Sequence, residues 1–178
     1  MPITINVPGK EFYNAEINEF LNTKPCTLVL EHSLLSISKW EAKWHKPYLS
    51  REEKTKEEVI DYVRCMTINN IQDPNVYYAL SKENIDQIVK YIEDPMTATT
   101  IKKENKRPSR EIITNEIIYY WMTALNIPFD PCQKWHLSHL MTLIEVCSIK
   151  NQPPKKMSKS EIMRQNHALN ASRLAHRH

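Results

Sequence analysis

The N-terminal part of the chain has the pattern of β-strands. Residues 3–7, ITINV, alternate between apolar and polar side chains, which is the period of a strand with one buried face. Residues 26–33, CTLVLEHS, are rich in residue types that favour strands. The segment between them, EFYNAEINEFL, fits a pair of strands as well as it fits a short helix. We therefore expect a small β element at the start of the chain.

From Ser33 onward the apolar residues recur every three to four positions, as they do in helices with one buried face. Segment 33–45 is the first with this period, and Pro47 should end it because proline cannot continue a helix. Trp40 and Trp44 are about one turn apart in this segment and therefore share a helical face.

Capping signals as well as periodicity predict two further helices. Thr55 and Glu58 have the spacing of a capping box at the start of segment 55–66. Ser81 is in position to cap the segment 81–94. The apolar faces that these helices are expected to bury are Val59, Tyr62, Val63 and Met66 in the first, and Ile85, Ile88, Val89 and Ile92 in the second.

The two most apolar helices come next. One is expected to start behind Ser109 and to be broken by Pro128. The other covers 130–150, with Asp130 as its N-cap and Pro131 at its first position. The core face of this second helix would consist of Leu137, Leu140, Met141, Ile144 and Cys147.

The last helix is expected behind Ser158, after the break at Pro153–Pro154, with Glu161 placed to complete a capping box. These patterns predict a mainly α protein with a small N-terminal β element (α+β). A helical body covers 1–150, and a Pro-hinged basic helical arm covers 151–178. The apolar stripe of the arm is too thin to be buried well by itself, since it contains only Ile162, Met163, Leu169 and Leu174.

Length and composition fit one soluble domain with an appendage. The chain has 178 residues, of which 41% are hydrophobic and 25% are charged. Its longest apolar runs, such as IIYYWM at 117–122, are far shorter than the ~20 residues that cross a bilayer. The N-terminus has neither the basic start nor the apolar core of a secretory signal. We therefore expect a cytoplasmic protein without a membrane partner.

Gly9 is the only glycine in the chain. The phosphate-binding loops of Rossmann and Walker type need several glycines, because the backbone must approach the phosphate closely. The nucleotide-dependent enzyme families built on those loops are therefore excluded, and no cofactor is expected.

The formal net charge of +3 is unevenly distributed. From Lys150 onward seven Lys and Arg residues stand against Glu161 alone, so that segment carries +6 and the rest of the chain −3. This asymmetry suggests that the arm has a partner of its own. Nucleic acid is one candidate, because cations bind phosphates through counterion release. The arm, however, has no aromatic side chain on which bases could stack.

Cys132, His136 and His139 would lie on one face of a continuous helix, and Cys and His are zinc ligands. No second ligand pair has zinc-site spacing, so packing at a helix interface explains them better and no metal is expected. The four cysteines also lack the local signature of a nucleophile. We therefore expect a protein that is not an enzyme.

Basic residues interleave with the densest acidic cluster of the chain at helical spacing. A solvated, salt-bridged helix face explains this cluster without a metal ion. Its members are Glu52, Glu53, Glu57, Glu58 and Asp61.

Three stretches resemble a known family. They read EHSLLSISKWEAKWHKPYLS at 31–50, REIITNEIIYYWMTALNIPFDPCQKWHLSHLMTLIEVCSIKN at 110–151 and PPKKMSKSEIMRQNHALNASR at 153–173. They are similar to small proteins encoded among the tail genes of tailed bacteriophages, the tail assembly chaperones. The positions that match the recurring pattern of this family are Lys39, Trp40, Glu41, Trp44, Trp135, His136, Leu137, Lys155, Lys156, Met157 and Ser158.

The resemblance implies a non-enzymatic chaperone that binds the tape-measure protein, the tail-tube protein or both in the host cytoplasm. The alternative interpretation is a nucleic-acid-binding protein, or a structural virion component such as a head–tail joining protein, that acts through the basic arm. A homo-oligomer is compatible with either interpretation. Tryptophans commonly anchor partners, and the basic arm with its thin apolar stripe has the character of a helix that needs a surface to lie against. The expected partner-binding positions are therefore Trp40, Trp44, Trp135, Lys155, Lys156, Met157, Lys159, Met163, Arg164, Leu169 and Arg173.

Overall fold

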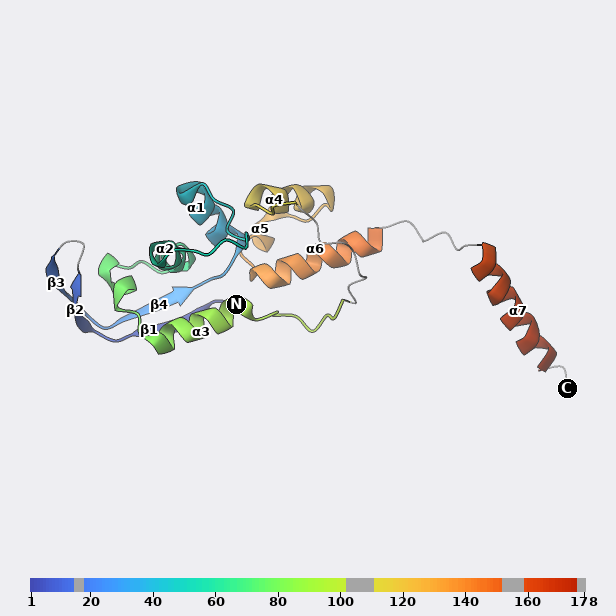
Figure 1. Cartoon of the computed structure of the whole chain (residues 1–178), viewed down its shortest axis with the longest axis horizontal. Coiled ribbons are helices and arrows are strands. Elements are labelled where there is room, and N and C mark those ends of the chain that lie inside the picture. Colours follow the sequence, from blue (N-terminus) through green and yellow to red (C-terminus); the bar gives the residue numbers. More distant parts are fainter. Residues whose placement is uncertain (15–17, 102–110, 152–158, 176–178) are drawn as a thin grey trace. The chain divides into compact units, whose positions relative to one another are not determined.

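The fold is mainly helical with a small β element at its N-terminus, and this confirms the predicted fold class (Figure 1). The chain divides into two compact units, Met1–Cys147 and Ser148–His178. The structure is a computed structural model, and the residues that it describes are 1–14, 18–101, 111–151 and 159–175.

Four short strands form two antiparallel ribbons. Strand β1 (Ile3–Val7) pairs with β4 (Cys26–Leu30). Strand β2 (Lys10–Asn14) pairs with β3 (Glu19–Thr23). The segment that fitted two alternatives in the sequence therefore forms a strand pair. Apolar side chains at alternate positions of β1 and β4 are buried, as the period of a strand requires; they are Ile5, Val7, Leu28 and Leu30.

The single glycine lies where the chain passes from β1 to β2. A Cβ atom at Gly9 would lie 2.8 Å from the Thr23 carbonyl oxygen and 2.8 Å from Cδ of Pro25, which is too close for any side chain. Beside it, the Thr23 hydroxyl accepts a hydrogen bond from the Lys10 N–H at 3.3 Å and donates one to the Lys10 carbonyl at 3.1 Å. Gly9 thus permits the close approach that joins the two ribbons.

Helices α2 (Lys56–Met66) and α3 (Lys82–Glu93) begin at their predicted caps. The Thr55 hydroxyl accepts the Glu58 N–H at 3.2 Å, and the Glu58 carboxylate accepts the Thr55 N–H at 2.8 Å. The Ser81 hydroxyl accepts the amide hydrogen of the third residue of α3 at 3.2 Å. Both signals were therefore interpreted correctly.

Helix α1 (Leu34–Trp44) ends before the proline that was expected to end it. His45 adopts a left-handed conformation with φ of 53° and donates its N–H to the Glu41 carbonyl at 2.8 Å. This C-cap stops the helix ahead of Pro47. Between α2 and α3 the chain forms a short 3₁₀ helix, η1 (Pro74–Ala79).

The helix expected behind Ser109, a residue outside the described ranges, is α4 (Asn115–Ala124), and the predicted start is wrong. The side chain of Thr114 makes no capping hydrogen bond. A carboxylate oxygen of Glu41 in α1 accepts the Asn115 N–H at 2.8 Å instead. A tertiary contact, which no local pattern encodes, therefore sets the start of α4.

The helix predicted over 130–150 is divided into α5 (Phe129–Cys132) and α6 (Leu137–Asn151). Asp130, expected as its N-cap, lies inside α5 with a non-helical ψ of 128°. The backbone ahead of α6 pairs with the segment before α1, since the first N–H of α6 donates to the His32 carbonyl at 2.9 Å. This pairing prevents one continuous helix.

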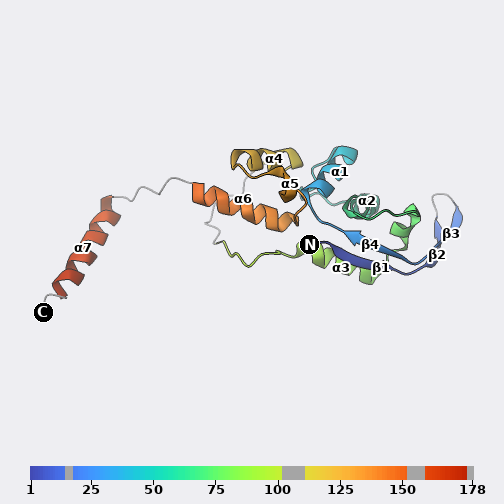
Figure 2. The same cartoon turned by 180° about the vertical axis from the view of Figure 1, so that it is seen from behind.

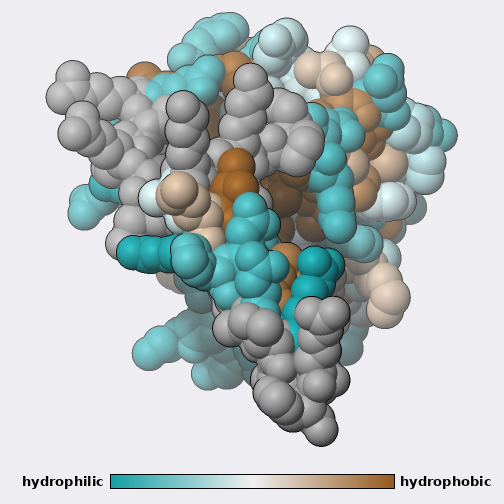
Figure 3. Space-filling model, turned by 90° about the vertical axis from the view of Figure 1, so that its right-hand side faces the viewer, coloured by the Kyte–Doolittle hydropathy of each residue, from teal (hydrophilic) through white to brown (hydrophobic). Residues whose placement is uncertain are grey.

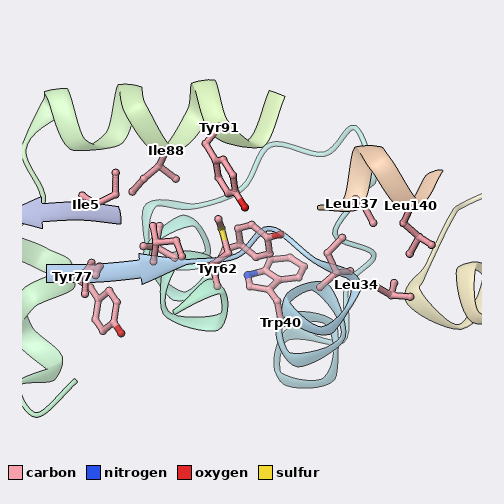
Figure 4. Packing of buried hydrophobic residues seen from close by; sticks show 14 of the residues in the cluster. Ile5, Leu34, Trp40, Tyr62, Tyr77, Ile88, Tyr91, Leu137 and Leu140 are labelled. Carbon is pink, nitrogen blue, oxygen red and sulfur yellow. The ribbon is translucent and has the colours of Figure 1, made fainter. Parts of the chain in front are cut away.

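Helices cover the β1–β4 ribbon on two sides. In both views α3 lies along β1 on one side of the ribbon, whereas α1 and α2 lie on the other side (Figures 1 and 2). Figure 4 shows Tyr91 of α3 pointing toward Tyr62 of α2, with Trp40 of α1 beside them. Leu137 and Leu140 of α6 extend the same buried cluster.

Apolar side chains also reach the surface. On the face drawn in Figure 3, hydrophobic residues (brown) lie between hydrophilic ones (teal). In the second unit, helix α7 (Lys159–Ala175) buries none of the side chains that are described on it. Its exposed large apolar side chains are Ile162, Met163 and Leu169.

Candidate partner-binding groove

A groove with mainly apolar walls lies between α2, η1 and α3 in the first unit. Its volume of ≈ 620 Å³ is within the range of sites that hold ligands or peptide side chains. Residues of all three elements line it, and they include Val59, Ile60, Tyr78, Ile85 and Val89.

The walls of the groove are large apolar side chains that stay about half exposed. Val59 is 44% exposed, Ile85 is 45% exposed and Val89 is 44% exposed. All three were predicted to belong to buried helix faces, and for these residues the prediction is wrong. Tyr62 and Ile88, from the same two predicted faces, are buried and form the floor.

The orientation of α3 explains why its apolar face opens into the groove. The residues that α3 buries are Asn84, Ile88 and Tyr91, which share one helical face. The Asn84 amide donates to the Asn6 carbonyl at 3.1 Å, and the Tyr91 hydroxyl donates to the Met1 carbonyl at 2.9 Å. These polar contacts fix the rotation of α3 about its axis, so that Ile85 and Val89 line the groove and do not enter the core.

Three charged side chains line the groove: Lys54, Lys56 and Glu93. The Lys54 ammonium lies 4.7 Å from the ring centroid of Tyr48 and 5.9 Å from that of Trp40. These are cation–π distances. The groove therefore combines an apolar floor with two lysines at the start of α2.

A buried cluster of His and Tyr side chains packs against the aromatic floor of the groove. Nδ1 of His32 and the Tyr62 hydroxyl share a hydrogen bond of 2.5 Å, and Tyr62 stacks on Tyr48 at 3.9 Å between ring centroids. Nε2 of His136 bonds to the Tyr91 carbonyl at 3.0 Å. Burial, and then the neighbouring His136, lower the pKa of His32 to about 4. The cluster is thus uncharged at neutral pH and fixes the aromatic floor in place.

The tryptophans predicted to bind partners differ in how deeply they are buried. Trp40 is 1% exposed and donates its indole N–H to the Glu58 carbonyl at 2.9 Å, so its assignment as a surface anchor is wrong. Trp44 is half-buried and donates its indole N–H to the Asp61 carboxylate at 2.9 Å. Trp135 is half-buried against His139, with 5.0 Å between the ring centroids.

The carboxylates of α2 are more deeply buried than the predicted solvated face. Glu58 and Asp61 are buried and face lysines of the α1 region. Lys46 lies 2.6 Å from the Glu58 carboxylate and lowers its pKa by hydrogen bonding. Lys43 lies 2.5 Å from the Asp61 carboxylate. These ion pairs join α1 to α2.

The three candidate zinc ligands do not share a helix. Cys132 is buried in α5, His136 is buried ahead of α6, and His139 is exposed on α6. The His136 ring is already hydrogen-bonded to the Tyr91 carbonyl. Among the described residues there is no group of three or more His, Cys, Asp or Glu side chains that could hold a metal ion.

The remaining predicted positions belong to the arm. Met163, Arg164, Leu169 and Arg173 lie on α7 with exposed side chains. Lys155, Lys156 and Met157 lie outside the described residues, as does the side chain of Lys159. Several residues that line the groove, Val59, Ile85 and Val89 among them, had instead been placed on apolar helix faces.

Comparisons with known proteins give no match. No protein-family model matches the chain, and neither a curated protein nor a solved structure matches it. Within the described part of the chain, no helix has the length and apolar character needed to cross a membrane.

Proposed function

We propose that the protein is a non-enzymatic chaperone that binds an amphipathic helix of its partner in the groove between α2, η1 and α3. The observation that carries this proposal is the set of half-exposed aliphatic side chains, Val59, Ile85 and Val89, around a buried aromatic floor. An apolar groove between helices is a recurring receptor for the apolar face of a helix.

The magnitude of the gain suits a temporary complex. Burying the remaining surface of a half-exposed Val or Ile contributes about 1 kcal/mol, judged from the 1.5–3 kcal/mol of full burial. The three wall residues would together contribute roughly 3 kcal/mol, before the losses of translational and side-chain freedom are subtracted. Such a groove holds a helix reversibly, which a chaperone requires.

The resemblance to tail assembly chaperones supplies the identity of the partner. A tape-measure protein is long and helical, so before assembly it presents apolar helical surface that must be covered. We propose that the tape-measure protein, or the tail-tube protein, is the segment held in the groove during phage assembly in the host cytoplasm.

Co-expression with each candidate partner tests the proposal. The chain should retain the tape-measure or tail-tube protein through purification, and Ile85→Asp should lower the retained amount about tenfold, because it places a charge against the partner's apolar face. Ile68→Asp is the matched control, since Ile68 is 54% exposed and does not line the groove. Retention of neither partner at low salt, or an equal loss in both variants, would contradict the proposal.

A second candidate function rests on the exposed arginines of α7, Arg164 and Arg173. These side chains are accessible to phosphates, so nucleic-acid binding remains the alternative proposal for the arm. Titration with duplex and single-stranded DNA at two salt concentrations distinguishes the two functions, since phosphate binding weakens steeply as salt rises. A structural virion component would instead be found in purified particles.

A further inference from the structure

We propose that the groove selects a helix with carboxylates along one flank of its apolar stripe, and that Lys54 and Lys56 recognise those carboxylates. This inference rests on the proposed function, because it specifies the chemistry of the helix that the groove holds.

The first argument is the pairing of the charges around α2. The lysines of the α1 region, Lys43 and Lys46, are neutralised by the carboxylates of Asp61 and Glu58. Within the described ranges, neither Lys54 nor Lys56 forms an ion pair. Lys54 and Lys56 therefore lack the carboxylate partner that Lys43 and Lys46 have.

The second argument is that Tyr48 already positions the Lys54 ammonium at the groove. Its ammonium lies over the Tyr48 ring, and its side chain is half-buried. An aromatic face attracts the ammonium without removing its charge, and an ammonium keeps N–H donors for a carboxylate. Because the side chain is already ordered, little conformational freedom is lost when a carboxylate binds.

The α3 side of the groove disfavours a helix that is acidic on both flanks. Glu93 of α3 lines the groove, and a shallow hollow beside it is lined by Asp86, Lys90, Glu93 and Asp94, which together have a net negative charge. Carboxylates of a partner would be repelled there. The matching helix therefore carries acidic residues only on the flank that faces Lys54 and Lys56.

Two synthetic helical peptides test this inference. Both carry the same aliphatic stripe at positions i, i+3, i+4 and i+7, and both have Gln along one flank. The other flank carries Glu in the first peptide and Lys in the second. Fluorescence anisotropy with the full chain should show that the Glu peptide binds about tenfold more tightly, and that added salt narrows the difference.

Charge reversal at the groove provides the decisive comparison. The double variant Lys54→Glu/Lys56→Glu should reverse the preference and bind the Lys peptide more tightly. Lys24→Glu/Lys39→Glu, at exposed lysines that do not line the groove, changes the net charge equally and should leave the preference intact. Lys56→Glu alone reverses one exposed charge and should narrow the preference even if the change at Lys54 disturbs the packing of Tyr48.

The outcomes separate this inference from the proposed function. Equal binding of the two peptides, both weakened by Ile85→Asp, would overturn the charge selection and leave helix binding in place. Binding of neither peptide would overturn the inference. Displacement of the Glu peptide by dodecanoate would assign the groove to a fatty acid and would also overturn it. A dimer that Ile85→Asp converts into a monomer would assign the groove to a second copy of the chain and would also overturn it.

Discussion

Asn84 and Tyr91 hold α3 against the start of the chain through side-chain hydrogen bonds to Asn6 and Met1. A hydrophobic pattern weighs only apolar residues, so it assigns Val89 to the core and ignores the polar side chains that orient the helix. The sequence placed four apolar residues on one face of α3, but only Ile88 among them is buried, whereas Ile85 and Val89 are about half exposed. Their division between core and groove depends on contacts with residues far away in the chain, which periodicity cannot reveal.

His32 makes a testable contribution to stability at the same scale. Its ring lies among Tyr48, Tyr62 and His136, and burial lowers its pKa to about 4. An unfolded chain protonates this residue near pH 6.5. The stabilisation is therefore complete above about pH 6.5 and is lost progressively as the pH falls toward 4.

The free energy of unfolding should consequently fall by about 2 kcal/mol between pH 7 and pH 5 through His32 alone. His32→Gln, which keeps a hydrogen-bonding side chain but cannot titrate, should remove that part of the pH dependence. Urea denaturation at the two pH values measures it. His167→Gln, at an exposed position on α7, should keep the wild-type slope; identical slopes in all three proteins would refute the role of His32.

At the scale of the elements, local signals predict helix starts well where the cap is local. Thr55 and Ser81 cap α2 and α3 from within the sequence, and both helices begin as expected. The predicted starts of α4 and α6 were wrong because acceptors far away in the chain bind the first N–H group of each helix. These acceptors are the Glu41 carboxylate for α4 and the His32 carbonyl for α6. A capping acceptor that belongs to another element produces no local pattern in the sequence.

Glu41 should therefore stabilise two elements at once. Its carboxylate is buried and accepts the Tyr48 N–H at 2.7 Å and the Asn115 N–H at 2.8 Å. Glu41→Ala leaves both donors without this partner and should lower the free energy of unfolding by about 2–3 kcal/mol. Hydrogen exchange at the Asn115 amide should accelerate, whereas Glu57→Ala, on the exposed face of α2, should change neither quantity. Unchanged exchange in Glu41→Ala would contradict the cap.

At the scale of the whole molecule, the groove arises only when α2, η1 and α3 meet. The sequence predicted the fold class and both helices that form its walls, and it predicted partner binding through tryptophans and the arm. It did not predict the groove, because an apolar residue at a core position and one at a groove wall have the same pattern along the chain. The structure adds the observation that the apolar stripe of α3 is wider than the face that this helix buries.

Methyl NMR of the isotopically labelled chain tests the central claim, that this groove holds a helical partner. On addition of a tape-measure fragment, the methyl signals of Val59, Ile85 and Val89 should shift, because the partner covers these side chains. Signals of Ile68 and Ile149, which are exposed but do not line the groove, should stay in place. Shifts confined to Ile162 and Leu169 of α7, with the groove methyls unchanged at saturating fragment, would contradict the account.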